Sequence, residues 1–280
     1  MAEFKAIFLH QEPWEAERFV AGVGPAMDVV SLPQGSDLLV DGVGHAETVM
    51  VVGGRGVTSV AAADLFPKLR LIQTLSAGTD TVPKVEMSER GVRVANNQGG
   101  NAVAVAEVTV ALIVSTYRRL MVQWNDLNIR GVYGEGFSSD WGRFHELTGK
   151  RVGIVGLGQI GSRVAKRLAG WECEIVYSDV VSHSAEYESA AGAVRVDFDE
   201  LIETSDVISL HVPLDRSTEK ILSDREFGRM KPGAIVINAC RGPVVDEAAL
   251  IRALDDGQIA GAGLDVTEIE PVEMTNALIG

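Results

Sequence analysis

The sequence has few cysteines, no long apolar run and no excess of basic residues. Only two of its 280 residues are cysteines, Cys173 and Cys240. They lack the short spacing of metal ligands, so we predict two buried thiols in a reducing cytosol and neither a disulfide nor a metal site. No apolar run approaches the roughly 18 residues that a membrane-spanning helix needs. The N-terminal segment MAEFKAIFLH also lacks the basic and apolar regions of a signal peptide.

Acidic residues outnumber basic ones, 39 to 25, and the formal net charge is −14. This balance argues against nucleic acid and against an anionic membrane surface as partners, because both are held by a basic face. Hydrophobic residues make up 46% and charged residues 23%, which is typical of a soluble globular chain, expected in the cytoplasm. The length is enough for two domains, each with its own core.

Short β-rich runs alternate with helical stretches, which predicts βαβ units and parallel sheets. The strands predicted for a first sheet are residues 5–9, 48–52, 71–74 and 92–95. Those predicted for a second sheet are residues 152–155, 174–177, 207–210, 234–238 and 262–265. Between the two series we expect a long helix over residues 102–120 and an extended, aromatic arm over residues 131–144. The predicted domains are therefore residues 1–100 and 101–280.

The strand RVGIV leads into the turn Gly156-Leu157-Gly158-Gln159-Ile160-Gly161 and then into a predicted helix over residues 162–168. GxGxxG alone is weak evidence, but this order of strand, turn and helix is specific for dinucleotide binding. The first glycine permits the tight turn, the second lets the pyrophosphate approach, and the third lets the helix pack closely. The N–H groups at the helix start would then bind phosphate. The alternative is a glycine turn that binds nothing.

The next predicted strand ends at Asp179, 18 residues after Gly161. An acid at this place accepts hydrogen bonds from the ribose hydroxyls and repels a 2′-phosphate. The following residues, VVSHS, contain no Arg or Lys that could hold such a phosphate. We therefore predict NAD as the cofactor in preference to NADP, with a solvated loop carboxylate as the alternative.

Four colinear segments carry a family resemblance: GKRVGIVGLGQIGSRVAKRL, SDVISLHVPLDRSTEKIL, MKPGAIVINACRGPVVDEAAL and GAGLDVTEIEPV. In order and spacing they resemble the D-isomer-specific 2-hydroxyacid dehydrogenases. The resemblance implies an α/β fold of two doubly wound parallel-sheet domains, a flavodoxin-like substrate domain and a Rossmann NAD-binding domain, with the active site in the cleft. It also implies hydride transfer between NAD(H) and a small 2-hydroxy acid or 2-oxo acid.

The same resemblance assigns two catalytic residues. Arg241 would bind the carboxylate and carbonyl of a 2-oxo acid, since a guanidinium makes bidentate bonds and stays charged. Glu270 would pair with a catalytic histidine, raising its pKa and fixing its tautomer. The alternatives are a surface arginine and a solvated glutamate.

Further cofactor contacts are implied by the matched motifs. Asp265 would accept a hydrogen bond from the nicotinamide carboxamide, and Thr218 would lie near the adenosine. The segment after the strand at residues 207–210 would line the cofactor, and so would the start of the arginine motif. These positions are His211, Val212, Pro213, Ala239 and Cys240. Structural roles remain the alternatives, most strongly for His211.

In the first domain, the segment LSAGTD resembles the substrate loop of the family. Ser76, Ala77 and Gly78 form a small-residue turn whose backbone N–H groups could hold a carboxylate without a side chain. A plain turn between a strand and a helix is the alternative.

The family's acid is a histidine in a Pro-His motif, two to three dozen residues after the glutamate. The sequence ends ten residues after Glu270, and its histidines are at positions 10, 45, 145, 183 and 211. We expect a truncated sequence that also lacks the return segment, with loss of the acid as the alternative. A catalytically inactive NAD-binding sensor or regulator is therefore the second functional reading.

The family dimerises through the region that follows residue 100. The apolar helix predicted over residues 102–120 and the aromatic residues Trp124, Tyr133, Phe137 and Trp141 predict a homodimer.

Overall fold

The computed structural model describes residues 4–10, 12–23, 27–33, 48–52, 66, 68–80, 82–132 and 146–279. The chain divides into two compact units, Met1–Asn101 and Ala102–Gly280.

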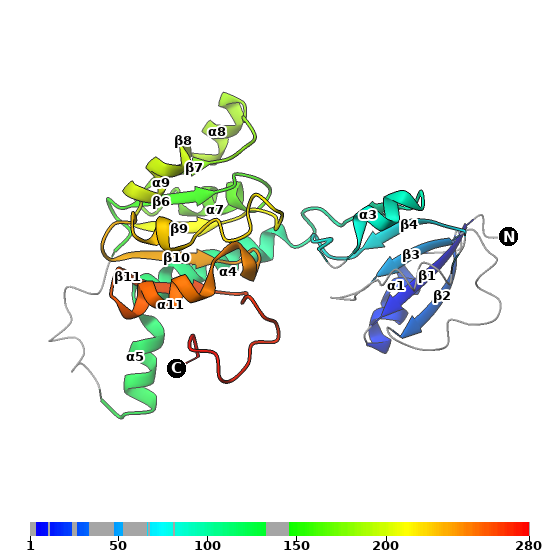
Figure 1. Ribbon diagram of the computed structural model, residues 1–280, viewed down its shortest axis with the longest axis horizontal. Coiled ribbons are helices and arrows are strands. Elements are labelled where there is room, and N and C mark those ends of the chain that lie inside the picture. The colour runs from blue at the N-terminus through cyan, green and yellow to red at the C-terminus, as the bar shows by residue number, and fades with distance from the viewer. Residues whose placement is uncertain are drawn as a thin grey trace. The chain divides into compact units, whose positions relative to one another are not determined.

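The first unit is built on one five-stranded parallel sheet (Figure 1). The strand order β2-β1-β3-β4-β5 is the flavodoxin-like order. Its core is apolar and includes Ile7, Phe66, Ile72 and Met87, each at most 1% exposed. The strands are β1 Phe4–His10, β2 Met27–Pro33, β3 Thr48–Val52, β4 Leu69–Thr74 and β5 Arg93–Ala95. The described helices are α1 Pro13–Val23 and α3 Lys84–Glu89.

The second unit has a six-stranded parallel sheet in the order β11-β10-β9-β6-β7-β8. This is the order of a Rossmann domain, in which two halves of the chain run outward from the centre. The strands are β6 Arg151–Val155, β7 Glu174–Ser178, β8 Val194–Arg195, β9 Val207–Leu210, β10 Ala234–Asn238 and β11 Ile259–Leu264. The helices are α4 Ala102–Tyr117, α5 Leu120–Asn128, α7 Gly161–Leu168, α8 Ala185–Ala191, α9 Phe198–Thr204, α10 Asp224–Phe227 and α11 Glu247–Asp255.

Both faces of this second sheet are covered, so its central strands are apolar throughout. All residues of β9 and β10 are buried, which is why VISL and AIVIN read as continuous runs rather than alternating ones. One face packs on α4, α7 and α8, and the other packs on α9, α10 and α11 (Figure 1). The prediction of a doubly wound α/β fold is confirmed.

Some elements differ from their predictions. The strands β2 and β8 were not predicted, and β11 begins at Ile259, before the expected residue 262. The long helix ends at Tyr117 and a second helix, α5, begins at Leu120. Arg119 lies between them with φ of 51°, a left-handed conformation that interrupts the helical path.

Of the four aromatic residues on which the homodimer prediction rests, the structure describes Trp124 alone. Trp124 lies on α5 and is 54% exposed. Tyr133, Phe137 and Trp141 lie outside the described residues, and so do His45 and His145.

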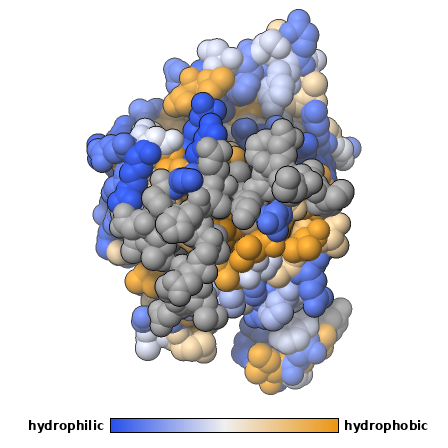
Figure 2. Space-filling model, turned by 90° about the vertical axis from the view of Figure 1, so that its right-hand side faces the viewer, coloured by the Kyte–Doolittle hydropathy of each residue, from blue (hydrophilic) through white to orange (hydrophobic). Residues whose placement is uncertain are grey.

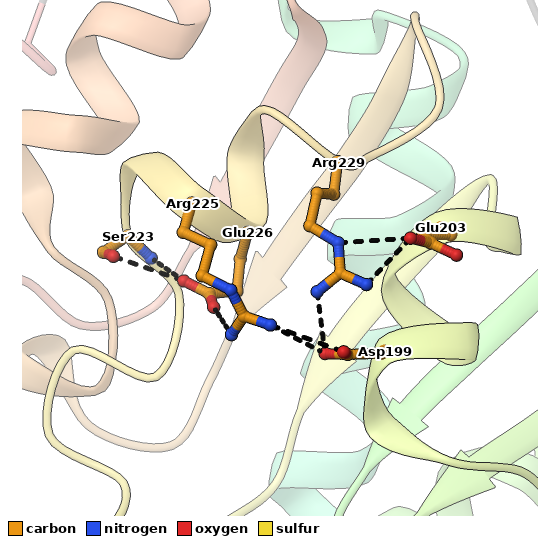
Figure 3. A network of polar contacts seen from close by, with 6 residues as sticks. All are labelled: Asp199, Glu203, Ser223, Arg225, Glu226 and Arg229. Atoms are coloured by element: carbon orange, nitrogen blue, oxygen red, sulfur yellow. Dashed lines mark hydrogen bonds and ion pairs between the residues drawn. The ribbon is translucent and has the colours of Figure 1, made fainter.

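Ion pairs connect the helices on one side of the second sheet (Figure 3). Arg229 bonds to Glu203 at 2.8 Å and to Asp199 at 2.9 Å, and Arg225 bonds to Asp199 at 3.3 Å. These groups are largely exposed, so each pair adds little stability. Figure 2 shows hydrophilic and apolar residues interspersed on the face that it presents. Among the described helices, none is long and apolar enough to cross a membrane.

A less exposed carboxylate joins three segments of the second unit. Asp206 accepts the N–H of Arg151 at 2.9 Å and bonds to Lys231 Nζ at 2.5 Å. Burial alone would raise the pKa of Asp206, but these two bonds outweigh it and lower the pKa below its ordinary value. The contribution to stability is therefore present above the pKa of an unfolded aspartate and is lost as pH falls through the folded-state pKa.

We predict that Asp206→Asn lowers the free energy of unfolding at pH 7 by about 1 to 3 kcal/mol, because it removes charge-assisted bonds at a mostly buried group. The difference from the unmutated chain should shrink as the pH is lowered toward the aspartate range. Urea unfolding at several pH values measures both effects. Asp199→Asn, at the exposed network of Figure 3, is the matched control and should cost less. Equal stability of Asp206→Asn and the unmutated chain at pH 7 would contradict this account.

Candidate functional site

The centre of the second sheet places two strand ends in contact. The chain leaves β6 toward β7 and β8 on one side, and leaves β9 toward β10 and β11 on the other. The carboxyl ends of β6 and β9 therefore flank the point where the strand order reverses, which is where open α/β sheets bind ligands. Gly156 follows β6 and His211 follows β9, and the N–H of His211 donates to Val155 O at 2.8 Å.

Each glycine of the turn meets a different geometric demand. Gly156 has φ of +92°, and a Cβ there would lie 2.6 Å from the carbonyl oxygen of His211. A Cβ on Gly161 would collide with the carbonyl oxygen of Gly156, so α7 starts directly against the turn. A Cβ on Gly158 would meet no described atom within 4 Å. The turn is thus closed against the protein at two positions and open at the third.

The start of α7 presents backbone donors beside this opening. Ser162 N–H donates to Gly158 O at 3.1 Å, and Arg163 N–H donates to Ile160 O at 2.9 Å. In the described part of the chain, the N–H groups of Gln159 and Ile160 donate to no backbone carbonyl. Such donors at a helix start favour a phosphate, so the geometry fits a dinucleotide.

Asp179 is anchored to the glycine turn. Its Oδ2 accepts the N–H of Leu157 at 2.7 Å, and its Oδ1 accepts the N–H of Val181 at 2.8 Å. His183 Nε2 lies 3.4 Å from Oδ2, and the His183 ring stacks on Tyr187 with centroids 4.7 Å apart. The carboxylate is 12% exposed and stands where a ribose next to the pyrophosphate would be met.

A basic side chain that the sequence analysis did not identify lies near Asp179. The segment VVSHS contains no Arg or Lys, but Arg195 reaches it from β8. Its guanidinium donates to Asp179 O and to Ser182 Oγ, both at 2.8 Å. The sequence analysis missed Arg195 because β8, the strand that carries it, has only two residues and was not predicted.

His211 is neutral at the reversal point. Its Nε2 lies 2.9 Å from Ser209 Oγ, and its buried Nδ1 has no hydrogen-bond partner among the described residues. Burial lowers the pKa of His211 to about 4. A buried polar atom without a partner, on the residue that follows β9, fits a position next to a bound group.

The residues after His211 hold their own loop. A Cβ on Gly156 would lie 3.1 Å from Val212 Cγ1, so Val212 borders the turn. Thr218 Oγ1 donates to Pro213 O at 2.6 Å and accepts the N–H of Asp215 at 2.9 Å. These bonds occupy the Thr218 hydroxyl inside the loop and give it a structural task.

The end of β10 is organised by Asn238, a residue that the sequence analysis did not select. Its Nδ2 donates to Arg241 O at 2.9 Å, and its Oδ1 accepts the N–H of Cys240 at 3.1 Å. Its backbone oxygen accepts the N–H of Asp265 at 2.9 Å. Asn238 therefore fixes both the turn that carries Arg241 and the start of the segment after β11.

The cysteines are both free, with Cys240 buried and Cys173 half-buried. Burial raises the pKa of the Cys240 thiol, so it is protonated at neutral pH. Ala239, its neighbour, is also buried.

The predicted catalytic residues lie on two segments that touch. A Cβ on Gly242, directly after Arg241, would collide with the carbonyl group of Thr267. Glu270 Oε1 accepts the N–H of Thr267 at 3.3 Å. Glu247, at the start of α11, accepts Glu268 N–H at 3.0 Å and Asn276 Nδ2–H at 2.7 Å, which holds the segment on both sides of Glu270. The structure thus brings these two segments together.

The predicted substrate loop belongs to the first unit and follows β4. Asn96 Nδ2 donates to Ala77 O at 2.6 Å, and Asn97 N–H donates to Ser76 O at 3.1 Å. Ser76 Oγ donates to Gly78 O at 2.8 Å. The carbonyl oxygens of the loop thus accept the hydrogen bonds that hold it. The sequence analysis missed the two asparagines that donate to them. No group of three or more potential metal ligands occurs in the described ranges.

Comparison with known proteins agrees with this geometry. Residues 110–280 match the family model described as D-isomer specific 2-hydroxyacid dehydrogenase, NAD binding domain. The chain is 42% identical over 211 residues to the glyoxylate reductase of Thermococcus litoralis, covering 73% of this chain and 62% of that protein. It is 38% identical over 215 residues to the glyoxylate reductase of Thermofilum pendens, covering 77% and 63%.

A solved structure is also similar, that of the Aquifex aeolicus D-lactate dehydrogenase in complex with NAD and lactic acid. It has a TM-score of 0.79 and 30% sequence identity, and the match covers 94% of this chain and 77% of that one. The two glyoxylate reductases are longer than the part that this chain matches, which spans a little over three fifths of their length.

Proposed function

Because the chain belongs to the D-isomer-specific 2-hydroxyacid dehydrogenase family, we propose that it transfers hydride between NAD(H) and a small 2-hydroxy acid or 2-oxo acid. The observation that carries the proposal is the contact of Gly242 with Thr267, which brings together the segments of Arg241 and Glu270. The names of the relatives are those of reductases and dehydrogenases, which supports an enzyme over an inactive NAD-binding regulator.

The second unit would hold the cofactor through the turn and the start of α7. The N–H groups of Gln159 and Ile160 would donate to the pyrophosphate above the open side of Gly158, and Asp179 would accept from the ribose hydroxyls. Asp265 would accept from the carboxamide. When bound, the cofactor supplies the redox chemistry, with NAD as the hydride acceptor and NADH as the hydride donor. The first unit would then be the substrate domain, with backbone N–H groups of Ser76, Ala77 and Gly78 toward the carboxylate.

Arg241 would bind the substrate carboxylate and carbonyl. Its guanidinium is positioned by a 2.6 Å bond to Cys240 O, and Asn238 holds its backbone. A fixed cation there stabilises the charge that develops on the carbonyl oxygen as hydride arrives.

Glu270 would serve a histidine that the family resemblance implies. A carboxylate next to an imidazole raises its pKa and fixes its tautomer. His211 is ill suited to replace that histidine, since burial keeps its imidazole neutral near pH 7. The names of the glyoxylate reductase relatives support a short 2-oxo acid as the substrate of this chain.

The cellular setting and assembly complete the proposal. We place the protein in the cytoplasm as a homodimer, without nucleic acid or membrane as a partner. Two free thiols and the acidic net charge support this setting. The exposed apolar side chains of α5 support the homodimer.

We predict that Arg241→Lys lowers kcat/KM by about 10²- to 10³-fold, because lysine keeps the charge but loses the two-pronged grip on carboxylate and carbonyl. The measurement is NADH oxidation by the protein with a panel of 2-oxo acids, beginning with glyoxylate and hydroxypyruvate. Arg225→Lys, in the exposed network of Figure 3, is the control. A near-normal rate for Arg241→Lys would give that arginine a structural role, and no turnover by the unmutated protein with any 2-oxo acid would refute the proposed activity.

NAD should bind far more tightly than NADP, because the mostly buried carboxylate of Asp179 repels a 2′-phosphate. Asp179→Ala should weaken NAD binding and reduce the difference between the affinities for NAD and NADP. Titration of both reduced cofactors by fluorescence measures this. Equal affinity of the unmutated chain for both would show that Asp179 does not select.

A homodimer is expected at micromolar concentration, with α5 in its interface. Met121, Trp124 and Leu127 are 50% exposed or more along this helix. Light scattering should report a dimer, and Trp124→Asp with Leu127→Asp should shift it toward monomer. Val85→Asp, at an exposed apolar position of α3, is the control. A monomeric unmutated protein would count against the prediction.

A further inference from the structure

The loop after β7 contains a cation that comes from a neighbouring strand. In the parallel pairing of β7 and β8, Arg195 lies opposite Tyr177, two residues before Asp179. Its side chain extends along the sheet to the carboxyl end of β7. There it donates to Asp179 O and to Ser182 Oγ, both at 2.8 Å. The guanidinium is therefore fixed at the backbone of the residue that would meet the adenosine ribose.

Arg195 and Ser182 have further hydrogen-bond donors that these two bonds do not use. A guanidinium has five N–H donors, and Arg195 spends one on each acceptor. The Ser182 hydroxyl accepts from Arg195, so its own O–H remains available as a donor. Both side chains are exposed, and Val180 next to them is 99% exposed, so the loop is open to a ligand.

We propose that Arg195 and Ser182 form a binding site for a phosphate monoester on the adenosine ribose, and that the charge of Asp179 alone keeps this site from accepting a 2′-phosphorylated cofactor. The proposal rests on the proposed function, which places the dinucleotide at the glycine turn. Arginine forks match the oxygens of a phosphate, and a serine hydroxyl completes such a site.

The relative exposure of the charges decides which effect prevails in the unmutated chain. The Asp179 carboxylate is 12% exposed and would be close to the 2′ position, so solvent screens its repulsion of a phosphate only weakly. Arg195 is exposed, so water and salt weaken its attraction. The aspartate therefore dominates, and the arginine becomes effective only when the negative charge is removed.

Asp179→Asn isolates that charge. The asparagine oxygen can still accept the N–H of Leu157, which keeps the anchor of the glycine turn, while the acceptor for the N–H of Val181 is lost. We expect NADPH to bind at least about tenfold more tightly to this variant than to the unmutated chain, in the range of charge-assisted contacts to phosphate.

The test adds Arg195→Gln to Asp179→Asn. Glutamine keeps donors for Asp179 O and Ser182 but has no charge. The readout is the ratio of the NADPH and NADH dissociation constants, measured by cofactor fluorescence at one fixed pH for all variants. The double variant should lose most of the gain in NADPH preference, by about tenfold in this ratio. A merely structural role of Arg195 would weaken both cofactors and leave the ratio unchanged.

Arg225→Gln in the Asp179→Asn background is the matched control. Arg225 is an exposed arginine bonded to Asp199 on another side of the unit, and its loss should not alter the ratio (Figure 3). If Arg195→Gln changes the ratio no more than Arg225→Gln does, the phosphate site is refuted while NAD binding stands. If the unmutated chain binds neither cofactor, the proposed function fails, and this site fails with it.

Discussion

The contact of Gly156 with the carbonyl group of His211 is the constraint on which the cofactor-binding unit depends. It joins the ends of β6 and β9 where the strand order reverses, and no side chain fits between them. The imidazole of His211 follows this contact, and desolvation lowers its pKa to about 4. The contact also directs the chain into α7, whose first N–H groups then lie beside the open face of Gly158. A ligand site results because backbone atoms occupy the places that side chains would otherwise fill.

A second close approach holds the segments of the two proposed catalytic residues together. Gly242 lies against Thr267, so the turn carrying Arg241 and the segment carrying Glu270 cannot separate without losing this packing. Asn238 and Glu247 hold these segments by hydrogen bonds from the sheet end and from α11. The functional side chains come from irregular segments, while their supports come from regular elements. That arrangement gives loops the precision that a catalytic geometry needs.

Local sequence signals predicted the parts of the site that depend on local geometry. The glycine turn could be read because strand, turn and helix are consecutive, and β9 and β10 could be read because both their faces are buried. The strand β8 could not, since two residues carry no periodicity, and Arg195 was missed with it. Asn238 was missed because an asparagine at the end of a buried strand forms no motif; two of its bonds lie within three residues, and the third, from Asp265, joins a distant segment. The helix break at Arg119 had no glycine or proline to announce it.

Charge poses an apparent contradiction, because an acidic chain of net charge −14 is assigned two anionic ligands. Screening resolves it. At physiological ionic strength the Debye length is about 8 Å, so most of the surface carboxylates contribute little inside the crevice. The groups that act at contact distance are backbone donors at the start of α7 and the guanidinium of Arg241. Asp179 differs from those surface carboxylates, since it is little exposed and bonded to the turn itself. Under the proposed function, its charge would therefore discriminate between cofactors that differ by one phosphate, whereas the net charge would not.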